Sequence, residues 1–143
     1  MIFSDINFLA VLVAAVAAFA WGAIWYMALS KPWLAAARID PSQGSRSIQP
    51  FIVSFIMLLV MAIVIFVITN SVYLGEFTLS NGLMVGFVCW LGFILTTLAV
   101  NQRYQGYGWG LTIIDALHWL GVALIIGAIL GLWGTGAEMA PVE

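Results

Sequence analysis

Four long apolar stretches constrain this chain more than any other feature of its sequence. They cover about residues 6–29, 51–73, 79–100 and 109–133. A helix needs roughly 20 apolar residues to cross the hydrocarbon core of a bilayer, and inside that core it pairs its backbone polar groups internally. We therefore predict an all-α fold in which residues 1–143 form one integral membrane domain, an up-down bundle of four transmembrane helices.

The composition supports this class of protein and excludes others. The chain is 64% hydrophobic and 7% charged, with a net charge of −2, whereas soluble domains contain about 25% charged residues. Because the sequence has no cluster of basic residues, no nucleic-acid partner is expected. The single cysteine, Cys89, excludes an intrachain disulfide, and its place in an apolar run indicates a buried, inert thiol.

The connections between the stretches indicate how the helices run. Two of them are short, so neighbouring helices are expected to be antiparallel. Positive residues lie only in the first and third connections, as Lys31, Arg38, Arg46 and Arg103. Acidic residues lie on the opposite side, as Asp5, Glu76, Glu138 and Glu143. By the positive-inside rule the first and third connections are cytoplasmic, and both termini lie outside.

Aromatic residues gather near the predicted cytoplasmic ends, as an interfacial belt would. They are Trp21, Trp25, Tyr26, Trp33, Tyr104, Tyr107 and Trp109. The segment "SKPWLAAARI" in the first connection has two open interpretations. It is either a short interfacial helix, capped by Ser30 and with Trp33 and Leu34 in the headgroup layer, or an irregular loop.

Small residues mark the faces on which membrane helices approach each other closely. We expect helix packing at Ala14, Ala18 and Gly22 in the first stretch, at Gly82 and Gly86 in the third, and at Gly127 and Gly131 in the fourth. The second stretch has no glycine and many large side chains, so we expect it to be the most lipid-exposed helix.

Two ionisable residues, Asp115 and His118, lie three positions apart within the fourth stretch and therefore share a helix face. Thr97 and Asn101 lie four positions apart near the end of the third, and we predict that all four side chains form one hydrogen-bonded cluster. An ionisable residue inside a membrane costs at least a few kcal/mol and indicates a functional site by default.

Three interpretations of this cluster are open. It is a structural clasp between helices, a site for a ligand, ion or proton, or a shallower feature in which Asp115 reaches water or Arg103. The chain has one histidine and no thiol near it, so no metal site and no cofactor are expected.

The segment "NFLAVLVAAVAAFAWGAIWYMALSKPW" resembles a known family through its Asn-Phe-Leu-Ala start, its small-residue span and its Trp-Gly and Trp-Tyr end. The family comprises the bacterial membrane proteins catalogued as domain of unknown function 1761. "DALHWLGVALIIGAILGLW" is similar to that family's last span. Its members usually have Ser-Pro directly after the Trp-Tyr pair, where this chain has Met27 and Ala28, with Pro32 later. The resemblance implies a multi-pass protein of the bacterial inner membrane, with four helices and no assigned reaction.

These observations favour a structural or interaction protein, either a homo-oligomer or an accessory subunit of a membrane complex, with the lipid bilayer as its surroundings. The alternative is a transporter or channel for a small solute or a proton, built on Asp115 and His118. A lipid-modifying membrane enzyme ranks last, because the sequence has no nucleophile motif and no metal-ligand set. We therefore expect that the protein is not an enzyme.

Overall fold

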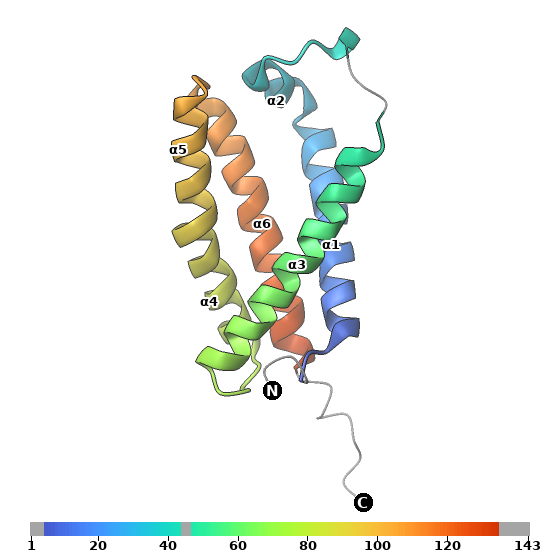
Figure 1. Cartoon of the computed structure of the whole chain (residues 1–143), viewed down its shortest axis with the longest axis vertical. Coiled ribbons are helices and arrows are strands. Elements are labelled where there is room, and N and C mark those ends of the chain that lie inside the picture. Colours follow the sequence, from blue (N-terminus) through green and yellow to red (C-terminus); the bar gives the residue numbers. More distant parts are fainter. Residues whose placement is uncertain (1–4, 44–46, 135–143) are drawn as a thin grey trace, which may run out of the picture.

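The computed structural model describes residues 5–43 and 47–134, and this part of the chain is helical with no strand (Figure 1). The four long spans are α1 (Phe8–Ala28), α3 (Gln49–Val72), the third span (Leu79–Tyr104) and α6 (Trp109–Trp133). All four are long and apolar enough to cross a membrane. The prediction of an all-α fold with four candidate membrane spans is confirmed, although the third span continues beyond residue 100.

The spans run antiparallel, so two opposite ends of the bundle can be distinguished (Figure 1). One end carries the short helix α2 (Ser30–Ala37) and the turn between the third span and α6. Because Lys31, Arg38 and Arg103 lie in or beside these segments, we call it the basic end. The opposite end carries the start of α1, the turn after α3 and the end of α6.

α6 lies at the centre of the bundle and the third span at its periphery. In the most apolar 18-residue window of each, 39% of the residues of α6 are buried, against 22% for α3 and 11% for the third span. The expectation that the second stretch is the most lipid-exposed was therefore wrong. The reason is that α3 turns Ala62, Phe66 and Thr69 fully into the core.

The third span is not a uniform α-helix. It consists of α4 (Leu79–Cys89), the π-helical segment η2 (Trp90–Leu95) and α5 (Thr96–Tyr104). In a straight α-helix Thr97 would share a face with Gly86, because the 11 positions between them are close to three whole turns. The wider π turns rotate the residues that follow by roughly one position, about 100°. As a result Gln102 is buried and Asn101 is exposed.

α4 and α6 lie backbone to backbone along their glycines. A Cβ atom at Gly82 would overlap the carbonyl oxygen of Gly127, and a Cβ atom at Gly127 would overlap that of Gly82. Gly86 lies in the same way against Ala123, and Gly131 lies against the residue that precedes α4. Such approach requires residues without side chains, as is common between membrane helices.

α1 packs its small residues against α3 and α6. Ala14 and Ala18 are fully buried in the core. One turn further along, Gly22 lies beside the imidazole of His118, where a Cβ atom would be 3.0 Å from Nε2. A side chain at position 22 would therefore require the imidazole of His118 to shift.

The first connection folds as the short helix α2, one of its two open interpretations. Ser30 is its first helical residue and not its cap; the cap position belongs to Leu29, which makes no side-chain capping bond. Arg38 ends α2 in the left-handed conformation, with φ of 58°. Its Nη2 donates to the carbonyl oxygen of Gly106 at 2.8 Å, and its guanidinium lies over the Tyr107 ring. α2 thus bridges from the end of α1 to the turn before α6.

Candidate functional site

The carboxyl group of Asp115 is the centre of a hydrogen-bond network at the basic half of the bundle. Its Oδ1 accepts from the hydroxyl of Tyr26 and from Nε1 of Trp33, each at 3.0 Å. Its Oδ2 accepts from Nε2 of Gln102 at 2.9 Å. The three donors come from α1, α2 and α5, so one side chain of α6 ties together three other segments. In all three bonds the carboxyl group is the acceptor.

A second set of bonds connects Gln102 to the turn at the basic end. The hydroxyl of Thr112 donates to Oε1 of Gln102 at 2.6 Å and accepts from Nη2 of Arg103 at 2.6 Å. Arg103 also donates to the carbonyl oxygen of Gly108 at 3.0 Å, and its guanidinium lies 4.1 Å from the centre of the Trp109 ring. Arg103 is therefore linked to Asp115 through two neutral side chains.

Four indole N–H groups converge on one stretch of α6 around Asp115. Each of them donates to a main-chain or side-chain oxygen there, which satisfies a polar group that would otherwise be costly in an apolar interior. The pairs are Trp21 with the carbonyl of His118 (3.2 Å), Trp25 with the carbonyl of Ile114 (3.2 Å), Trp90 with the carbonyl of Ala116 (2.8 Å) and Trp33 with Asp115.

This arrangement corrects the prediction of an interfacial belt for four of its seven members. Trp21, Trp25, Tyr26 and Trp33 donate inward to α6 instead of lining the membrane surface. Tyr104 and Trp109 are exposed, as a belt requires. The indole of Trp21 fits because α6 has Gly121 beneath it, where any Cβ atom would overlap the ring.

His118 is buried beside the network, with 7% of its surface exposed. Its ring lies 4.7 Å from that of Tyr26 and 5.1 Å from that of Trp119, measured between ring centres. Its Nδ1 is buried and has no hydrogen-bond partner among residues 5–43 and 47–134. The expected direct pairing of Asp115 with His118 is therefore not the arrangement found, since other donors occupy the carboxyl group.

The structure does not bring Thr97 and Asn101 to Asp115. Both are exposed, and the neighbouring residue Gln102 takes the place that we predicted for Asn101. The cause is the π-helical segment, which changes the face that α5 turns toward α6. The indole and phenol donors of the first span and α2 were visible in the sequence, but their clustering near the ends of the spans led us to predict that they line the membrane surface.

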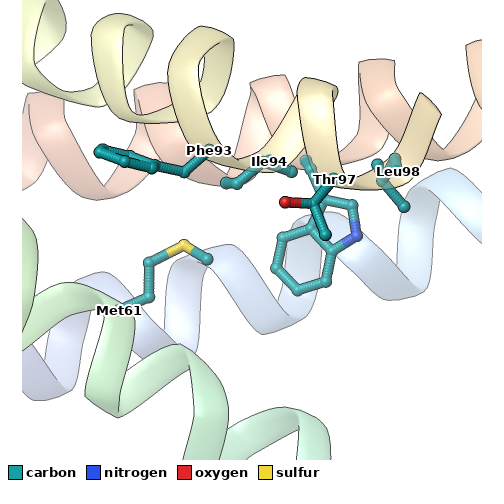
Figure 2. Close-up of a pocket in the computed structure, with 6 residues that line it drawn as sticks. Met61, Phe93, Ile94, Thr97 and Leu98 are labelled. Carbon is teal, nitrogen blue, oxygen red and sulfur yellow. The ribbon is translucent and has the colours of Figure 1, made fainter. Parts of the chain in front are cut away.

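Thr97 instead lines an apolar groove between α3 and the third span. Figure 2 shows Met61 of α3 facing Phe93, Ile94 and Thr97 across this groove. Leu98 and Trp119 complete its lining, and its volume is about 290 Å³. The groove is open to the outside of the bundle and its lining is almost entirely apolar.

The comparisons with known proteins place the chain in a family. A family model described as "Protein of unknown function (DUF1761)" matches residues 9–131, a range that includes all the donors and acceptors of the Asp115 network. The chain belongs to this family. No curated protein and no solved structure matches the chain. The resemblance seen in the sequence is confirmed.

For this DUF1761 member, the arrangement around Asp115 has the properties of a structural bond. Within the described residues no group of three or more His, Cys, Asp or Glu side chains could hold a metal ion. Asp115 is bound by donors fixed on three other segments, so it resists the separation of α6 from α1, α2 and α5. Two buried nitrogens of this site, Nε of Arg103 and Nδ1 of His118, have no hydrogen-bond partner in the described part of the chain, and this bonding does not explain them.

Proposed function

We propose that the protein is a small structural subunit of the membrane, acting through contacts with copies of itself or with a larger membrane complex. The observation that carries this proposal is the bonding of Asp115 by Tyr26, Trp33 and Gln102. It uses the intramembrane carboxyl group to fasten helices. A group held in this way serves as a clasp and is a poor candidate for reversible binding.

The peripheral third span supplies the surface for such contacts. It is the least buried span, and a Cβ atom at Gly92 would have no other atom within 4 Å. Thr96, one turn along, is also exposed and returns its hydroxyl to the Gly92 carbonyl of its own helix. Small residues on an outer helix face let a second helix approach closely, so we place the partner contact at Gly92 and Thr96.

We further propose that the protein resides in the cytoplasmic membrane of a bacterium, with its basic end in the cytoplasm and both termini outside. The support for this orientation is the charge distribution: Lys31, Arg38 and Arg103 lie at one end, whereas Asp5 and Glu76 lie toward the other. We also propose that it has no enzymatic activity, because the sequence contains no nucleophile motif and Asp115 is occupied.

Native mass spectrometry of the protein, extracted gently from its own membrane, tests the interaction role. We expect a defined oligomer or a stoichiometric foreign partner. We expect Gly92→Phe to abolish this association while the chain still folds, because the side chain at 92 meets open space. Gly110→Phe is the matched control, since Gly110 is also exposed and a Cβ atom there would likewise meet open space. A wild-type chain that is only monomeric would contradict the proposal.

A second candidate function is proton or small-solute transport, and the buried Nδ1 of His118 favours it. An imidazole nitrogen without a partner beside a carboxyl network is a group that can take up a proton. Purified protein in liposomes should then carry a flux that Asp115→Asn and His118→Ala abolish. A flux unaffected by both changes, or no flux at all, would exclude this candidate.

A further inference from the structure

We propose that the groove between α3 and the third span binds one acyl chain of an anionic glycerophospholipid, whose phosphate is bound by Lys31 and Arg38 at the basic end. The proposal rests on the position of the groove, on the polar face of α5 above it and on the charge at its end. It does not depend on the proposed role as an interaction subunit.

The groove lies at the depth of an acyl chain. Its lining residues on the third span, Phe93 to Leu98, lie roughly 9 to 17 Å below the end of α5 at 1.5 Å per residue. One leaflet contributes about half of the ~30 Å hydrocarbon core. A lipid of the leaflet at the basic end would therefore place a chain in the groove and its headgroup level with the end of α5.

α5 carries a polar face from the groove toward that end. Thr97 lines the groove, and Asn101 and Gln105 follow it at intervals of four positions, which places all three on one side of the helix. All three are exposed. The amides of Asn101 and Gln105 are donors at the depths where a phospholipid presents its ester and headgroup oxygens, and Thr97 lies below them, at the depth of the acyl chain. This face is the place where the structure puts Thr97 and Asn101 instead of the Asp115 network.

The cations at this end are available to a phosphate. Arg38 is exposed and uses Nη2 on the carbonyl of Gly106, just beyond Gln105, leaving further N–H donors of its guanidinium. Lys31 is exposed on the same helix. The nearby acidic residue, Asp40, accepts two hydrogen bonds from Ser42 and keeps its negative charge, but the three cations at this end, Lys31, Arg38 and Arg103, outnumber it. The charge at this end therefore favours an anionic headgroup over a zwitterionic one.

The test is native mass spectrometry of the full chain extracted from vesicles of phosphatidylglycerol and phosphatidylcholine in equal amounts. We expect one retained phosphatidylglycerol per chain, preferred at least about tenfold over phosphatidylcholine. Lys31→Gln with Arg38→Asn should remove this preference; asparagine tolerates the left-handed backbone at 38. Thr97→Phe, which fills the groove, should abolish the retention of either lipid.

Two matched controls separate the site from general effects. Ser80→Asp makes the same single change in net charge as Lys31→Gln, but at the opposite end, and Val100→Phe adds an aromatic ring at an exposed position of α5 that does not line the groove. Neither should change lipid retention. Equal retention of the two lipids, or a preference that survives the Lys31 and Arg38 changes, would overturn the headgroup assignment. Retention that survives Thr97→Phe, or a second chain retained in place of lipid, would overturn the groove assignment.

If Arg38→Asn prevents folding, Lys31→Gln alone keeps the proposal testable, because that side chain is exposed and its loss leaves α2 intact. A severalfold fall in preference is then expected, and no fall would contradict the assignment of Lys31. Failure of this inference would leave the association test with Gly92→Phe unaffected, since Gly92 does not line the groove.

Discussion

Nε1 of Trp33 donates to Oδ1 of Asp115 at 3.0 Å, across 82 positions of sequence. Trp33 lies on α2, a short helix outside the four spans, and Asp115 lies on the most buried span. Through this bond a short helix that has no buried residue is tied to the interior of the bundle. The bond also means that α2 cannot leave the basic end without exposing a lone pair of Asp115.

Trp33→Phe tests this bond while keeping an aromatic ring in place. We expect the free energy of unfolding to fall by about 1–2 kcal/mol, because one acceptor site of Asp115 loses its donor. Thermal unfolding in detergent, followed by circular dichroism, measures the change. Trp133→Phe, at the exposed end of α6, is the control and should change stability much less.

Asp115→Asn should destabilise the protein although it keeps the shape of the side chain. The new amide N–H₂ would take one acceptor position and face a donor, either the amide of Gln102 or the pair from Tyr26 and Trp33. We expect a loss of about 1–3 kcal/mol, the cost of an unsatisfied buried polar group. Asp115→Ala should cost more, since it leaves every donor without its acceptor.

Gln102→Glu in the Asp115→Asn background provides the rescue. The pair then exchanges donor and acceptor, and the second oxygen of the carboxylate introduced at position 102 still accepts from the hydroxyl of Thr112. Part of the lost stability should return. If the double variant is no more stable than Asp115→Asn alone, the bond between positions 102 and 115 does not hold the helices together.

Gly82→Ala should separate α4 from α6, because the added methyl group overlaps the carbonyl oxygen of Gly127. We expect a loss of about 1–3 kcal/mol, as for other overpacked interiors. Gly92→Ala, in the same span but facing open space, should stay within about 0.5 kcal/mol of the wild type. Equal effects of the two substitutions in a thermal unfolding assay would contradict the close contact of α4 with α6.

Reporter fusions test the proposed orientation. A fusion to the C-terminus should report the outside of the cytoplasmic membrane, and a fusion in the first connection should report the cytoplasm, as the positive-inside rule predicts. A cytoplasmic C-terminus would reverse the proposed topology. It would also move the lipid proposed for Lys31 and Arg38 to the outer leaflet.

The sequence predicted the spans well because hydropathy alone determines which segments can enter a bilayer. It did not predict the partners of Asp115, because that choice depends on helix rotation. The π-helical segment from Trp90 to Leu95 turns Gln102 toward Asp115, where a regular helix would place Asn101. No residue pattern in "WLGFIL" predicts a π-helical segment. Tyr26 and Trp33 were not predicted as donors to Asp115 for a different reason. Their rings are amphipathic, and such rings occur both at membrane surfaces and beside buried polar groups.

The order of the Asp115 partners along the chain has a consequence for biosynthesis. Tyr26, Trp33 and Gln102 all precede Asp115, as do the tryptophans that bind the carbonyls around it. A ribosome makes the N-terminal part of a chain first, so every donor already exists when the carboxyl group emerges. Asp115, whose carboxyl group is costly to place in the hydrocarbon core, is thus the last member of its network to be made. It enters the membrane when its hydrogen-bond donors are already present.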